Sequence, residues 1–138
     1  MKLKVITGIL LLLIVLIVSC QSNKGPEFDR YYSAGKLVYQ NHCQNCHGEN
    51  GEGLQRLMPP LTDSVFLKKN MHLLPCLVKN GFQGKITIAR KDFDWQMPPA
   101  NLNNIEIAQA LTYITNSFGN NLGTVTFDDV SAAINKCK

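Results

Sequence analysis

The sequence contains little that would suit a membrane-spanning or nucleic-acid-binding protein. Its long apolar run, Val5 to Val18, has 14 residues, whereas a helix needs roughly 20 to cross a bilayer. No run of like charges would follow a phosphate backbone, and the net charge of +4 includes Lys2 and Lys4 near the N-terminus. We therefore expect no nucleic-acid partner, and a transmembrane helix is the less favoured explanation of the apolar run.

The N-terminus has the order of an export signal, with two lysines, the apolar run and then Ser19 and Cys20. This order predicts a signal peptide over residues 1–19. Residues 17–20 resemble the lipobox of bacterial lipoproteins, which implies cleavage before Cys20 and lipid on its sulfur. Acyl chains contribute about 0.8 kcal/mol per buried methylene, so we expect residues 20–27 to form a lipidated N-terminus and a flexible tether. The protein would face the periplasm, on either the inner or the outer membrane.

Residues 28–138 are expected to form one small domain of the all-α class. Spacing of apolar residues, caps and glycines favours four or five short helices, within residues 28–42, 62–67, 73–80, 103–118 and 127–137. Residues 82–95 show no convincing period and only hint at an extended stretch that need not form a sheet. Short helices bury little apolar area at this size, so a large buried cofactor would complete the core.

The motif that carries chemistry is Cys43-Gln44-Asn45-Cys46-His47. It has the C-x-x-C-H spacing that attaches c-type haem: Cys43 and Cys46 form thioethers with the porphyrin, and His47 is placed to ligate the iron. A thioredoxin-like dithiol would need a strand before the motif and a helix after it, but here a helix is expected before it and a glycine-rich loop after it. A structural zinc site would need a second pair of ligands at similar spacing. The prediction is one covalent haem c.

Two segments, residues 35–61 and 96–120, together resemble the class I cytochrome c family of bacterial respiratory chains. The resemblance implies a small helical fold wrapped around the haem. It also implies that Gly35 and Tyr39 on the first helix touch the helix that contains Leu111 and Tyr113. A glycine at position 35 suits such a close helix crossing.

The second axial ligand must come from one of the remaining methionines and histidines. The candidates are Met58, Met71, Met97, His42 and His72. Met97 precedes two prolines and matches the methionine-proline ligand loop of the family, so it is predicted as the second iron ligand beside His47. Met58 also precedes two prolines, but it lies close to His47 in sequence, and we expect it to pack with Pro59 and Leu61 against the haem. The other three lie at a helix start or directly beside the attachment motif.

Ligation by His47 and Met97 would fill both axial positions, which leaves the iron no vacancy for oxygen or peroxide. We therefore predict an electron carrier and not an enzyme. The resemblance implies redox partners such as a quinol-oxidising complex and a terminal oxidase or periplasmic reductase. The alternative is a haem enzyme or gas sensor with an open distal site, which would require Met97 to be unbound. A fixed electron-entry subunit of a larger complex would have the same chemistry as a mobile carrier.

Four further residues receive assignments from the sequence. Trp95 and Tyr113 are expected near the haem, where an aromatic side chain either packs or donates a hydrogen bond to a propionate. Cys76 and Cys137 are predicted to form a disulfide, since an oxidising compartment and an even count of remaining cysteines favour one. Two unrelated buried thiols are the alternative.

Overall fold

The computed structural model describes residues 2–19 and 24–137. Helix α1 (Lys2–Ser19) covers the apolar run, and none of the helices described is long and apolar enough to cross a membrane. Cys20, the predicted lipidation site, lies outside the described residues. Helix α2 (Gly25–His42) begins inside the segment expected to be a tether. Pro26 in its first turn explains this start, because proline has no N–H to lose there and its φ is already helical.

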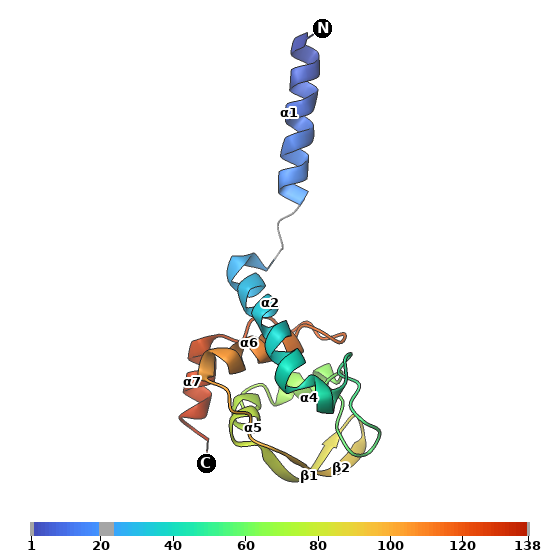
Figure 1. The fold of residues 1–138 in the computed structure, drawn as a ribbon, viewed down its shortest axis with the longest axis vertical. Helices are drawn as coiled ribbons and strands as arrows, with labels where there is room; N and C mark the ends of the chain where they lie inside the picture. The colour runs from blue at the N-terminus through green and yellow to red at the C-terminus, as the bar shows by residue number, and fades with distance from the viewer. Residues whose placement is uncertain (1, 20–23, 138) are drawn as a thin grey trace.

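The domain after residue 24 is mostly helical (Figure 1). Its helices in the described residues are α2, α3 (Gln44–His47), α4 (Ser64–Lys69), α5 (Leu74–Asn80), α6 (Asn104–Ile114) and α7 (Phe127–Ile134). The predicted number was four or five. The difference is α3, a single turn that follows α2 after one residue and contains most of the attachment motif.

The first turns of three helices are closed by side chains of the preceding residue. Asn103 and Glu106 form a reciprocal capping box at α6, as their spacing suggests, and Thr126 and Asp129 form another at α7. Asp63 caps α4 through bonds from the backbone N–H groups of two residues in its first turn. These local interactions set where the helices begin.

Helices α2 and α6 cross closely at Gly35, as the resemblance implies. A Cβ added there would lie 3.0 Å from the Cβ of Tyr113 and 2.5 Å from the carbonyl carbon of Gln109. Beside the crossing, the ring of Tyr113 lies 5.4 Å from that of Tyr39 and 5.1 Å from that of Tyr32. The two helices therefore pack through aromatic rings on either side of a glycine contact.

The all-α expectation is wrong for residues 82–97, which form an antiparallel hairpin of β1 (Phe82–Ile88) and β2 (Lys91–Met97). In Figure 1 the hairpin lies at the end of the domain away from the start of α2. Gly84 interrupts the alternation in β1, which hides the strand period. The turn residues Ala89 and Arg90 have φ values of 51° and 61°, where asparagine and glycine are the usual signal. The sequence therefore lacks the common hairpin signature.

A disulfide joins Cys76 on α5 to Cys137 after α7, with a sequence separation of 61 residues. Closing a chain segment of that length stabilises a fold by about 4 kcal/mol in the chain-entropy model. The bond holds the C-terminal helix against α5, whose other residues Leu74, Leu77 and Val78 face the cavity described below.

Candidate functional site

A largely apolar cavity of about 280 Å³ lies inside the domain. It is lined from the motif and α3 by Cys43, Cys46 and His47, from α4 by Phe66 and Leu67, from α5 by Leu74, Leu77 and Val78, from the hairpin by Phe82, Ile86, Ile88, Phe93 and Met97, and from α6 by Leu111 and Ile114. Two thiols, the imidazoles of His42 and His47 and a thioether thus share one cavity whose remaining walls are mostly aliphatic and aromatic. This is the composition expected of a buried haem site.

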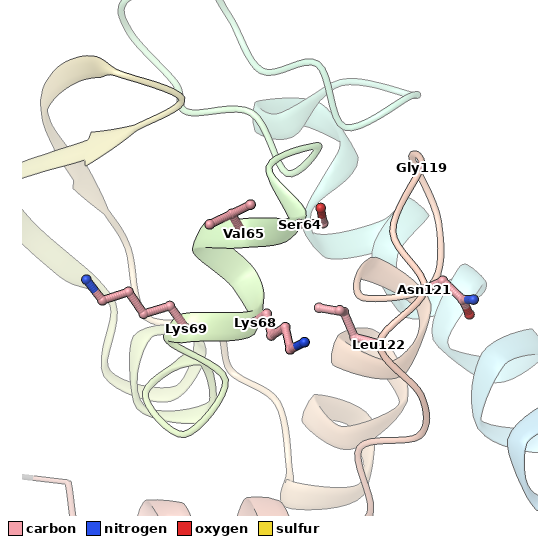
Figure 2. Close-up of a pocket in the computed structure, with 7 residues that line it drawn as sticks. All are labelled: Ser64, Val65, Lys68, Lys69, Gly119, Asn121 and Leu122. Carbon is pink, nitrogen blue, oxygen red and sulfur yellow. The ribbon is translucent and has the colours of Figure 1, made fainter.

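A larger hollow of about 570 Å³ lies on the surface between α4 and residues 119–122 (Figure 2). Its lining contains Ser64, Val65, Lys68, Lys69, Gly119, Asn121 and Leu122. None of these residues offers a thiol, an imidazole or a thioether, and Figure 2 shows the side chain of Lys69 directed away from Leu122. The chemistry of the motif therefore belongs to the smaller cavity.

The two motif cysteines are brought together by a single helical turn. The N–H groups of Cys46 and His47 both donate to the carbonyl oxygen of Cys43, over 3.1 Å and 2.9 Å. Burial, with a contribution from Cys46, raises the pKa of the Cys43 thiol to about 11. Reactive dithiols have lowered thiol pKa values, and the motif follows a helix, not a strand. Both observations favour haem attachment over a redox-active disulfide.

His47 is held in an orientation suited to metal ligation. Its side chain is buried, and Nδ1 lies 3.1 Å from the carbonyl oxygen of Pro59. Because a carbonyl can only accept, Nδ1 carries the proton and Nε2 keeps its lone pair. Burial also lowers the pKa of His47, which favours the neutral imidazole that a metal requires.

The glycine-rich loop after the motif places Pro59 beside His47. Gly53, with φ of 70°, donates to the carbonyl oxygen of His47 over 2.8 Å, and Leu61 donates to the carbonyl oxygen of Gly51 over 2.7 Å. A side chain at Gly53 would collide with the backbone of Met58 and Pro59. The loop thus folds back on the motif, and Pro59 and Leu61 both line the cavity.

Met97 is the last residue of β2 and lines the same cavity as His47. The segment that follows it is fixed to the end of α5. Ala100 donates to the carbonyl oxygen of Val78 over 2.9 Å, and Nζ of Lys79 donates to that of Leu102 over 3.0 Å. Gly81, with φ of 75°, lies against the backbone that follows Met97. The end of α5 therefore positions this loop.

The other four candidates for the second ligand differ in their position relative to the cavity. His42 also borders the cavity, whereas Met58 and Met71 are not among its lining residues. Met71 packs against the hydrophobic core, and His72 is exposed. Met97 is the methionine on the cavity wall among the described residues.

The structure reassigns one of the two expected aromatic contacts. Tyr113 is not on the cavity wall but packs between Tyr32, Tyr39 and Phe118, so its role is in the contact between α2 and α6. The backbone of Trp95 pairs with Gly84 in the hairpin, but its side chain lies outside what the structure describes.

Sequence reasoning assigned none of the lining residues of α4 and α5, nor four of the hairpin: Phe82, Ile86, Ile88 and Phe93. The available signal was the even spacing of Phe82, Ile86 and Ile88, which Gly84 interrupts, because alternate side chains of a strand share one face.

Comparison with known protein families agrees with this geometry. A family model described as Cytochrome c matches residues 32–117, more than half of the 138 residues. The chain belongs to the cytochrome c family. It therefore carries covalently bound haem c and is a haem-based electron carrier. No curated protein matches this cytochrome. The mostly helical fold and the thiols, imidazole and thioether of the cavity fit such a haem.

Proposed function

We propose that this cytochrome is a one-electron carrier of a bacterial respiratory chain, with haem attached through Cys43 and Cys46 and ligated by His47 and Met97. The observation that carries the proposal is that all four side chains line one largely apolar cavity. Nε2 of His47 is the nitrogen left for the iron, because Nδ1 bonds to Pro59.

The haem iron supplies a one-electron couple when it is bound, and the protein sets its potential and access. A methionine thioether beside histidine raises the potential of a haem. The apolar walls contributed by α4, α5, α6 and the hairpin work in the same direction, because a low-dielectric environment disfavours the additional positive charge of the oxidised iron. His47 and Met97 would both bind the iron, which would leave it no position for oxygen, so the residues of the site support electron transfer and not oxygen chemistry.

The test is visible absorption of the haem-loaded protein, oxidised and reduced, for the wild type and Met97→Ala. We expect a low-spin wild-type spectrum whose methionine-to-iron charge-transfer band is lost in Met97→Ala. Met71→Ala is the matched control, because Met71 packs outside the cavity, and it should keep the band. A high-spin wild-type spectrum that shifts on addition of carbon monoxide or peroxide would favour the enzyme or sensor instead.

We also propose that the protein is a lipoprotein that faces the periplasm, anchored through Cys20. The sequence around Cys20 supports this. Helix α2 begins at Gly25. Five residues, 20–24, would then link the lipid to the domain and span at most about 18 Å. Such a tether would keep the haem domain close to membrane partners such as a quinol-oxidising complex and a terminal oxidase or periplasmic reductase.

The anchor is tested by growing cells with labelled palmitate and isolating the wild type and Cys20→Ser. Label is expected in the wild type and not in the variant, and the mature wild type should begin at Cys20. A wild type that takes up no label, or that begins at another residue, would contradict a lipid anchor at Cys20. Co-purification from mild detergent would distinguish a mobile carrier from a fixed subunit.

A further inference from the structure

The hairpin forms one wall of the haem cavity and also carries Met97. In the register of the two strands Phe82 pairs with Met97, and Ile86 pairs with Phe93. These four side chains line the cavity, together with Ile88. The position of the hairpin relative to the helices therefore decides where Met97 lies.

The base and the tip of the hairpin are held in different ways. At the base, Gly81 lies in close contact with the backbone that follows Met97. At the tip, the turn between Ile88 and Lys91 uses Ala89 and Arg90 in the left-handed region, with φ of 51° and 61°. Residues other than glycine rarely adopt this backbone conformation, so the turn by itself contributes little to the stability of the hairpin.

An interaction from outside the hairpin holds the tip. One carboxylate oxygen of Asp63, Oδ1, accepts from the N–H groups of Val65 and Phe66 over 3.1 Å and 3.0 Å and so caps α4. The other, Oδ2, accepts from the N–H of Ala89 over 2.9 Å, across 26 residues of sequence. Because Phe66 on α4 and Ile88 in the hairpin both line the cavity, this carboxylate joins two of its walls.

We propose that Asp63 is a positioning residue that holds the hairpin tip against α4 and thereby keeps Met97 on the haem iron. This inference rests on the proposed ligation by His47 and Met97. Without the bond to Ala89, the tip moves away from α4 and the hairpin turns about the contact at Gly81. Because β2 runs from the tip to Met97, this turn changes the direction of the Met97 side chain. Met97 then leaves the iron more often, and an external ligand gains access to the vacant position.

Asp63→Asn separates this role from helix capping. Asparagine is as good a cap as aspartate, so the bonds to Val65 and Phe66 are retained. Its amide NH₂, however, replaces the oxygen that faces the N–H of Ala89, and two donors then oppose each other. The matched control is Asp129→Asn, which alters a first-turn carboxylate of α7 that bonds to Thr126 and not to the hairpin.

The experiment measures the rate at which imidazole binds to the oxidised haem-loaded protein, with the methionine-to-iron band and the reduction potential as further readouts. Asp63→Asn should bind imidazole at least tenfold faster than the wild type, whereas Asp129→Asn should bind at the wild-type rate. A merely structural role for Asp63 would lower stability without this selective change in rate. Equal rates for Asp63→Asn and the wild type, beside a fast Met97→Ala, would overturn the inference and leave the proposed ligation intact.

Two further measurements cover other outcomes. A wild type that lacks the methionine band and binds imidazole as fast as Met97→Ala would refute the ligation, and this inference with it. If Asp63→Asn does not retain haem, hydrogen exchange of the wild type decides. The amide of Ala89 should then be as protected as strand amides and more protected than that of Arg90, and rapid exchange at Ala89 would overturn the proposal.

Discussion

Replacing Gly35 with alanine tests the contact between α2 and α6. The new Cβ would lie 2.5 Å from the carbonyl carbon of Gln109 and 3.0 Å from the Cβ of Tyr113, where ordinary contacts begin at 3.4 Å. One of these neighbours is backbone, which has no other rotamer to adopt. The two helices must therefore separate by roughly 1 Å, since a close-packed interior has little free volume.

Two opposing effects decide the magnitude. Alanine is more favourable than glycine inside a helix by about 1 kcal/mol. Overpacking costs about 1 to 3 kcal/mol, and a backbone clash belongs at the upper end. The same separation loosens the contacts of Tyr113 with Tyr32 and Tyr39. Each aromatic pair contributes about 0.5 to 1.5 kcal/mol. A gap of that size removes about a quarter to a half of such a contribution. We expect a net loss of about 2 kcal/mol.

The assay is guanidinium unfolding of the haem-loaded protein, followed by circular dichroism. Ala34→Gly is the control, because it changes helix propensity at the neighbouring position of α2 without altering the crossing, and it should cost about 1 kcal/mol. If Gly35→Ala is as stable as the wild type or more stable, propensity outweighs the clash and the close crossing is refuted.

Three other perturbations have defined outcomes. Loss of the disulfide through Cys76→Ser and Cys137→Ser should lower the free energy of unfolding by about 4 kcal/mol, and unchanged denaturation midpoints would contradict this. If Met97 binds the iron as proposed, Gly81→Ala should weaken the methionine-to-iron band without loss of haem, because its Cβ would collide with the backbone of residues 97–99; an unchanged ferric spectrum would argue against that contact. A hydrogen bond from a backbone N–H of α4 is the main cause that lowers the pKa of Asp63. A hydrogen bond from a threonine hydroxyl is the main cause that lowers the pKa of Asp129. Their stabilisation is therefore present above about pH 4 and is lost as pH falls through the lowered values. Acid titration of unfolding should show a flatter slope in Asp129→Asn, and an unchanged slope would contradict this.

The parts of the site that the sequence predicts are those encoded within a few residues. The spacing of Cys43, Cys46 and His47 needs only one helical turn to bring the three side chains together. The capping box of Asn103 and Glu106 is equally local. The residues of such motifs are close in space because they are close in sequence.

The hairpin could not be predicted from local sequence, because the residue that stabilises its turn is distant in sequence. Its turn has Ala89 and Arg90 in place of residues that favour a positive φ, and the bond that supports the turn comes from Asp63. Tyr113 carried two expectations. The resemblance implied that its helix contacts α2, and its ring does lie beside Tyr32 and Tyr39. Its aromatic character suggested the haem, but Tyr113 is not among the residues that line the cavity.

The reduction potential of the haem depends on parts of the chain that are distant in sequence. The groups that bind the haem belong to short motifs, whereas the walls of the cavity come from α4, α5, α6 and the hairpin, brought together by tertiary contacts. Substitutions in the walls, such as Phe93→Leu, should therefore leave haem attachment intact. They should shift the reduction potential, because the walls control the dielectric around the iron and its exposure to water. The shift is expected to be negative, since a smaller buried side chain admits water that stabilises the oxidised form, and redox titration beside a haem stain would measure the two properties separately.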